Sequence, residues 1–149
     1  MSVSMLVPIN DSVHSRAIIN FLITMPFCPE DTRITLIHIF RQPTSGEDLM
    51  GKKFMAEQPA RLSAMLQKAK ERLVEEKGFH PSQVETELLT DPYPSVTEGI
   101  IEFFKKSNYD MVVIGRKRMS KSEEFVLGDI SVKLVRTLEN TSVLVVKTG

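Results

Sequence analysis

Two segments near the C-terminus combine glycine with charged side chains in a way that could hold a phosphate group. The first is Gly-Arg-Lys-Arg at residues 115–118, and the second is Gly-Asp-Ile-Ser at residues 128–131. A glycine at a strand end lets the backbone approach a bulky anion, and one at a helix N-terminus offers free N–H groups and the positive end of the helix dipole. The sequence therefore predicts a phosphate cradle. An alternative stays open, in which Gly115 and Gly128 are turn and cap residues beside a solvated basic loop.

A second candidate stretch is Pro-Ile-Asn-Asp-Ser at residues 8–12, which follows the first expected strand. In an open α/β sheet, ligands bind outside the carboxyl ends of the strands, where the strand order reverses. The sequence has no G-x-x-x-x-G-K-S/T and no G-x-G-x-x-G after the first strand, which argues against a P-loop protein and a dinucleotide-binding dehydrogenase. The three histidines, His14, His38 and His80, lack metal-ligand spacing, and a surface role is expected for His14.

Short apolar segments rich in β-branched residues alternate with amphipathic segments along the chain. The expected strands are residues 3–9, 33–40, 84–89, 111–114 and 142–147. Helical stripes lie within residues 18–25, 62–77, 96–104 and 127–138, with a Ser95 cap before the third and Gly78 after the second. The alternation predicts an α/β fold, an open doubly wound parallel sheet with helices on both faces.

One long stretch without a clear period, residues 41–57, is expected to be a surface loop. Its apolar part, residues 49–55, is interpreted as packing on the sheet edge or on a partner. A flexible lid over the pocket is the alternative.

Length and composition restrict the class of protein. The chain has 149 residues, enough to bury a core as one domain, 1–149. Lys plus Arg and Asp plus Glu number 19 each, and this neutrality argues against nucleic acid or an anionic membrane as partner. The lone Cys28 cannot form an internal disulfide, and no apolar run suits a signal peptide or a membrane span. We expect a cytoplasmic protein.

Four stretches resemble the universal stress protein family, in order along the chain. They are Val-Pro-Ile-Asn-Asp-Ser at 7–12, Asp-Met-Val-Val-Ile-Gly at 110–115, Phe-Val-Leu-Gly-Asp-Ile-Ser at 125–131 and Ser-Val-Leu-Val-Val-Lys at 142–147. The resemblance covers essentially the whole chain. It implies a five-stranded sheet of the adenine nucleotide alpha hydrolase-like type, with strand order 3-2-1-4-5. It also implies a regulatory stress-response protein, not an enzyme, that binds ATP or AMP.

Many members of that family bind the nucleotide through a glycine, two residues, a glycine, nine residues, a glycine, and a serine or threonine. In this chain Gly115 and Gly128 match the first and third glycines. Arg118 replaces the second glycine, and Asp129 replaces the hydroxyl residue. The resemblance therefore implies a nucleotide site that keeps its frame but has altered contacts.

The altered residues change the expected electrostatics of the site. Asp129 sets a carboxylate where the phosphate is expected, and two charges about 4 Å apart repel by roughly 1–4 kcal/mol. Arg118 could offset this by contacting the phosphate, or it could pair with Asp129 and close the site. A bound Mg²⁺ could also reconcile Asp129 with the phosphates.

Three further residues acquire binding roles from the resemblance. Asn10 stands where the family has an aspartate near the ribose, and its amide can still hydrogen-bond a hydroxyl. Ile39 matches a position that contacts the base. Ile130 is expected to offer a backbone N–H.

The last expected strand lies at a sheet edge and is apolar, which invites pairing with another chain. In the resembled family this strand commonly forms a two-fold dimer, so a homodimer through Val143 and Val145 is expected. Two alternatives to the nucleotide-binding regulator remain open. One is a nucleotide-free homodimeric interaction module of the same family, and the other is a slow ATP-hydrolysing enzyme.

Overall fold

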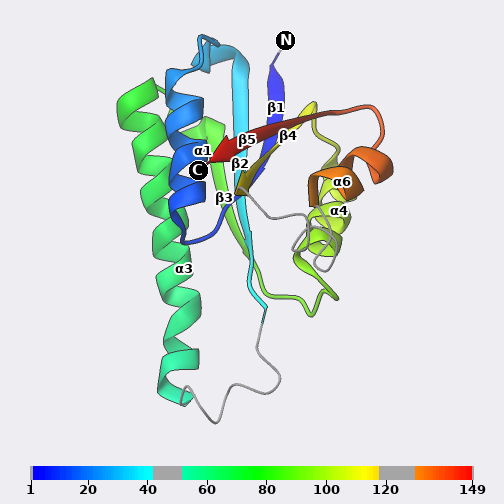
Figure 1. Cartoon of the computed structure of the whole chain (residues 1–149). Coiled ribbons are helices and arrows are strands. Elements are labelled where there is room, and N and C mark those ends of the chain that lie inside the picture. The colour runs from blue at the N-terminus through cyan, green and yellow to red at the C-terminus, as the bar shows by residue number, and fades with distance from the viewer. Residues whose placement is uncertain (1, 42–51, 118–129, 149) are drawn as a thin grey trace.

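The computed structural model describes residues 2–41, 52–117 and 130–148. Five parallel strands form one sheet in the order β3-β2-β1-β4-β5 (Figure 1). Their bounds are β1 Val3–Pro8, β2 Thr32–Ile39, β3 Val84–Leu89, β4 Met111–Lys117 and β5 Ser142–Thr148. The predicted fold class and strand order are confirmed.

Helices cover both faces of this sheet. Helices α1 (Val13–Thr24) and α3 (Lys52–Arg72) lie on one face, and α4 (Val96–Ser107) and α6 (Ile130–Thr137) lie on the other (Figure 1). Each face has its own hydrophobic core, because strand side chains alternate between the two sides. Within residues 2–41, 52–117 and 130–148, no helix is long and apolar enough to cross a membrane.

The central strands β1 and β4 are paired over a short length only. Met5 lies opposite Met111 and Leu6 opposite Val112, and no later residue of β1 is in register with β4. Beyond this point β1 stays with β2, since the Ile9 N–H donates to the Ile37 carbonyl at 2.8 Å. Strand β4 stays with β5 as far as Lys117. The two strands therefore part toward their carboxyl ends, where the strand order reverses.

Two boundaries differ from the sequence prediction. Residues 52–57 were expected in a loop, but α3 already begins at Lys52. The residues at its start are good helix formers, and Pro59 inside the helix obscured their continuity with the stripe that begins at Leu62. Strand β4 extends to Lys117 and does not end at Ile114, so Gly115 lies within a strand. Residues 42–51, with the apolar part of the expected loop, lie outside the described residues.

The end of the long helix confirms its predicted cap. After α3 the chain forms a π-helical turn, Leu73–Lys77, and Gly78 follows at φ +87°. Its N–H caps the helix by donating to Val74 at 3.2 Å. Only glycine, and to a lesser extent asparagine, adopts this left-handed conformation without strain.

Replacing Gly78 by alanine should therefore reduce the free energy of unfolding by about 1–2 kcal/mol. A Cβ at this position would meet no atom within 4 Å, so the cost comes from the backbone alone. Gly78→Asn should recover most of the loss, because asparagine tolerates the conformation. Urea unfolding followed by circular dichroism measures both variants. Equal stability of the alanine and glycine proteins would contradict the assignment.

Candidate functional site

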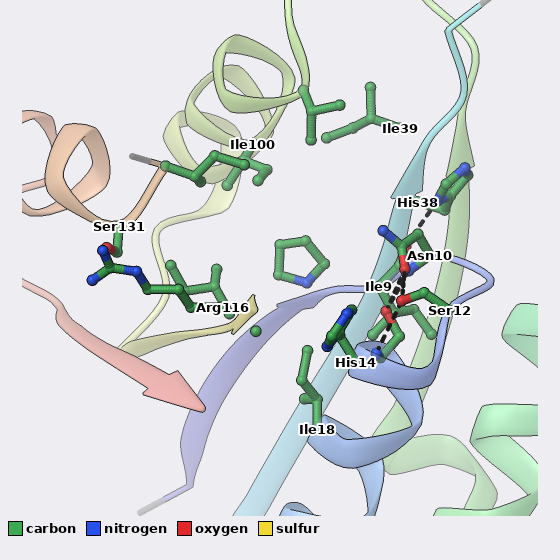
Figure 2. A pocket seen from close by; sticks show the side chains of 16 residues that line it. Ile9, Asn10, Ser12, His14, Ile18, His38, Ile39, Ile100, Arg116 and Ser131 are labelled. Carbon is green, nitrogen blue, oxygen red and sulfur yellow. Dashed lines mark hydrogen bonds between the residues drawn. The ribbon is translucent and has the colours of Figure 1, made fainter. Parts of the chain in front are cut away.

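A pocket of about 430 Å³ opens where β1 and β4 part. Figure 2 shows that its labelled side chains, apart from Ile9 and Ile18, form three groups. One group is apolar and includes Ile39 and Ile100, and the second consists of Arg116 and Ser131. The third group is polar and contains Asn10, Ser12, His14 and His38.

Four of the residues predicted from sequence line this pocket. They are Asn10 after β1, Ile39 at the end of β2, Gly115 in β4 and Ile130 at the start of α6. The structure thus brings together positions that are more than 100 residues apart in sequence. The other three predicted site residues, Arg118, Gly128 and Asp129, lie outside the described residues.

Hydrogen bonds to two serines fix the side chain of Asn10. Its Oδ1 accepts hydrogen bonds from the hydroxyl of Ser12 and from the hydroxyl of Ser15, the latter at 2.8 Å. The Ser15 Oγ in turn accepts the backbone N–H of Asn10 at 2.7 Å. Ser12 is also the N-cap of α1 and accepts the Ser15 N–H at 3.3 Å. The first turn of α1 therefore holds Asn10 in place at the pocket.

Both histidines of the polar group lie at the wall of the pocket. His38 Nδ1 is 2.7 Å from the carbonyl oxygen of Ile9. A carbonyl only accepts, so the N–H at Nδ1 donates this hydrogen bond. His14, for which a surface role was expected, is half-buried and lines the pocket. His80 caps a short turn before β3 and does not line the pocket.

Gly115 lies on β4 under helix α1. A Cβ added to it would come 2.8 Å from Cδ1 and 3.2 Å from Cγ1 of Ile18, a buried residue. The glycine therefore makes room for the helix, and no positive φ is recorded for it. The sequence-based expectation that Gly115 admits an anion stays a prediction; in this structure Gly115 lines the pocket next to Ile18, which lines it too.

A similar close contact supports the apolar wall. A Cβ on Gly99 of α4 would lie 3.0 Å from Ile39 Cδ1 and 3.1 Å from Tyr93 Cδ2. Helix α4 can thus pack directly on Ile39. The Tyr93 hydroxyl is 3.5 Å from Oδ2 of Asp91, and burial, with a smaller contribution from that carboxylate, raises the pKa of Tyr93. The phenol is therefore neutral at physiological pH.

Arg116 of β4 adds a positively charged side chain to the pocket lining. The Arg116 side chain points toward Ser131, which lies in the first turn of α6 (Figure 2). Ser131 is buried, whereas Ile130 before it is 42% exposed. An arginine beside a helix N-terminus suits an anionic group of a ligand.

The described lining does not by itself form a metal site. It contains no carboxylate, and residues 2–41, 52–117 and 130–148 hold no group of three metal-ligating side chains. Mg²⁺ prefers carboxylate and phosphate oxygens. The predicted Mg²⁺ would thus depend on Asp129, whose placement is not described.

The sequence profile of the universal stress protein family matches residues 1–147. This chain belongs to the universal stress protein family. The match covers more than the pocket, since it extends from before β1 into β5. It confirms the resemblance drawn from the four sequence stretches.

Solved structures of the family share the fold. A universal stress protein in complex with cAMP is 17% identical, with a TM-score of 0.68, covering 99% of this chain and 98% of that one. One from Archaeoglobus fulgidus in complex with dAMP is 14% identical, with a TM-score of 0.59 and coverage of 97% and 98%. One from Lactobacillus plantarum is 16% identical, with a TM-score of 0.64 and coverage of 97% for both chains. The sequence matches no curated protein. At these identities the likeness establishes the fold.

Several lining residues were not chosen from the sequence. Arg116 was noted only as part of a basic loop, and Ser15 was not considered. A serine three positions after the N-cap gave no distinctive signal. His38 directly precedes Ile39 in β2, so its position at a strand end could have indicated it. Ile18 was read as a core residue of α1, and it is both core and pocket wall.

Gly115→Ala should destabilise the protein by about 1–3 kcal/mol, because the new methyl group would lie 2.8 Å from Cδ1 of the buried Ile18 and this side chain would have to shift. Ile18→Val removes Cδ1, the atom in closest contact, and alone should cost about 0.5–1.5 kcal/mol. In the double variant the alanine should cost less than in the wild type. Denaturant unfolding of the four proteins measures this coupling. Strict additivity would show that Ile18 is not what requires the glycine.

Proposed function

We propose that this universal stress protein binds an adenine nucleotide, AMP or ATP, in the pocket between β1 and β4. The observation that carries the proposal is the arrangement of the lining into an apolar group, a cationic group and a polar group around one cavity. A purine has a flat apolar surface, the sugar carries hydroxyls and the phosphates are anionic. Each part of a nucleotide therefore has a matching group of side chains.

Size and charge agree with this assignment. The cavity of about 430 Å³ lies within the range of roughly 300–1,000 Å³ that is typical of small-molecule sites. Ile39 and Ile100 can contact the base, and Arg116 can neutralise a phosphate. The backbone N–H of Ile130, at the start of α6, is available to the same phosphate in this proposal. Arg118, Gly128 and Asp129 would complete the phosphate contacts and decide between AMP and ATP.

The complexes of related proteins support the same ligand class. The structures with cAMP and with dAMP show that proteins of this fold hold adenine nucleotides. In this chain, we expect Asn10 and the altered glycine motif to determine which adenine nucleotide is bound.

We further propose a regulatory role without catalysis. Among the described lining residues no carboxylate or thiol is available as base or nucleophile. The hydroxyls of Ser12 and Ser15 both donate to Asn10, and His38 Nδ1 is engaged by the Ile9 carbonyl. The exposed Cys28 fits a reducing compartment, so a cytoplasmic location is part of the proposal.

Ile130→Glu tests the nucleotide site against a matched control. Ile130 lines the pocket, whereas Val135 lies on the same helix, is 62% exposed and does not line it. Both tolerate a glutamate for folding, but only Glu at 130 meets the phosphate. Calorimetric titration with AMP and ATP, with and without Mg²⁺, should show at least about tenfold weaker binding for Ile130→Glu and no change for Val135→Glu.

The proposal fails if millimolar AMP and ATP give neither heat nor a thermal shift with the wild-type protein. It also fails if the two glutamate variants bind equally well. Nucleotide recovered after prolonged incubation should be chemically unchanged, and steady phosphate release would favour the enzyme alternative.

We also propose that the protein is a homodimer through β5. This strand lies at the sheet edge and is paired on one side, with β4. Val143 and Val145 face the core of α4 and α6, while Leu144 and Val146 face that of α1. All four remain half-exposed in the single chain. A second copy placed against this edge would cover them on both faces of the sheet.

Changing Val143 and Val145 together to threonine should raise the dimer dissociation constant by about tenfold or more, because apolar surface is lost from both copies. Threonine keeps the β-branched shape, so the strand is retained. The control is the same change at Val132 and Val135, two exposed residues of α6. Sedimentation equilibrium measures the association. A monomeric wild type, or equal weakening by the control pair, would contradict an interface at β5.

A further inference from the structure

We infer that the polar group of the pocket selects a nucleotide whose ribose carries a phosphate on its 3′ oxygen. This inference rests on the proposed adenine-nucleotide function and names the ligand class within it. The residue that determines it is Asn10, through the direction of its hydrogen bonds.

The amide oxygen of Asn10 is already occupied. A carbonyl oxygen has two lone pairs, and the hydroxyls of Ser12 and Ser15 use both of them. Within the described part of the chain, the Nδ2 hydrogens of Asn10 have no partner. The side chain therefore presents donors to the pocket, and a ligand atom beside it must be an acceptor.

The neighbouring charge also favours an anionic acceptor. Asp11 is the next residue, but its Oδ2 lies 2.7 Å from Nη2 of Arg61 on α3, and Asp11 does not line the pocket. The described lining contributes no carboxylate to this corner. A phosphate oxygen here would meet donors without a nearby negative charge to repel it.

The arrangement of the three groups decides which part of the nucleotide reaches Asn10. With the base against Ile39 and Ile100 and the 5′-phosphate toward Arg116, the ribose lies between them. The third group, which contains Asn10, lies on the other side of the pocket from Arg116 (Figure 2). In this orientation we place the 2′,3′ edge of the ribose against it. A free 3′ hydroxyl both donates and accepts, whereas a phosphorylated 3′ oxygen and its phosphate oxygens only accept. The donors of Asn10 match the phosphorylated form.

Two isomeric ligands and one isosteric substitution test this directly. Adenosine 3′,5′-bisphosphate and ADP carry the same number of phosphates and differ in where the second one is attached. Asn10→Asp keeps Oδ1 for Ser12 and Ser15 but replaces the donor group by an anionic oxygen. Asn20→Asp adds the same charge on the exposed side of α1, away from the pocket.

Calorimetric titration should show that the wild-type protein prefers the 3′,5′-bisphosphate to ADP. Asn10→Asp should shift the ratio of the two dissociation constants by about tenfold or more toward ADP, since a charge-assisted hydrogen bond is replaced by repulsion. Asn20→Asp should leave the ratio unchanged. The wild-type ratio tests the inference even if Asn10→Asp fails to fold.

If ADP binds as well as or better than the bisphosphate in the wild type, the inference is overturned while the proposed function stands. An unchanged ratio in a folded Asn10→Asp protein overturns it as well. If neither ligand binds, and AMP does not bind either, the proposed function itself fails and the inference with it.

Discussion

Proline at position 8 constrains the pairing of the central strands, and the pocket depends on this constraint. In a parallel sheet, successive residues direct their backbone groups to opposite neighbours. The Ile9 N–H points to β2, so the N–H of residue 8 would point to β4, and proline has none. The last pair in register between these strands is Leu6 with Val112. The missing donor falls where the ladder ends, and the cavity opens beyond it.

The walls of the cavity are part of the core, not additions to it. Ile18 and Ile39 line the pocket and are buried, and each packs against a glycine of a neighbouring element. Gly115 lets α1 approach β4, and Gly99 lets α4 approach β2. Closely packed walls resist deformation. The same contacts therefore determine the stability of the sheet and the shape of the pocket.

The sequence predicted the fold well because its signals are local. Apolar β-branched runs located the strands, and Ser95 and Gly78 marked helix ends that the structure confirms. For the site, the positions of the strand ends indicated Asn10 and Ile39. They did not indicate which contacts and hydrogen bonds these side chains make. The occupation of the Asn10 oxygen depends on the three-dimensional positions of two serines, and the need for Gly115 depends on a helix that packs over it. Neither of these two tertiary contacts leaves a recognisable pattern in the amino-acid sequence.

Ser12 contributes both to the stability of α1 and to the ligand preference of the pocket. Its Oγ caps α1 by accepting the Ser15 N–H, and its hydroxyl hydrogen goes to Asn10. Losing a serine cap typically costs about 0.5–2 kcal/mol, so a change that frees Asn10 also weakens the first turn of α1. The serine that caps the helix thus also donates the hydrogen bond that helps to keep the amide oxygen away from the ligand. An exchange of Asn10 itself does not remove the hydrogen bond from the Ser15 N–H to Ser12 Oγ, so ligand selectivity can vary at this position while the cap of α1 is kept.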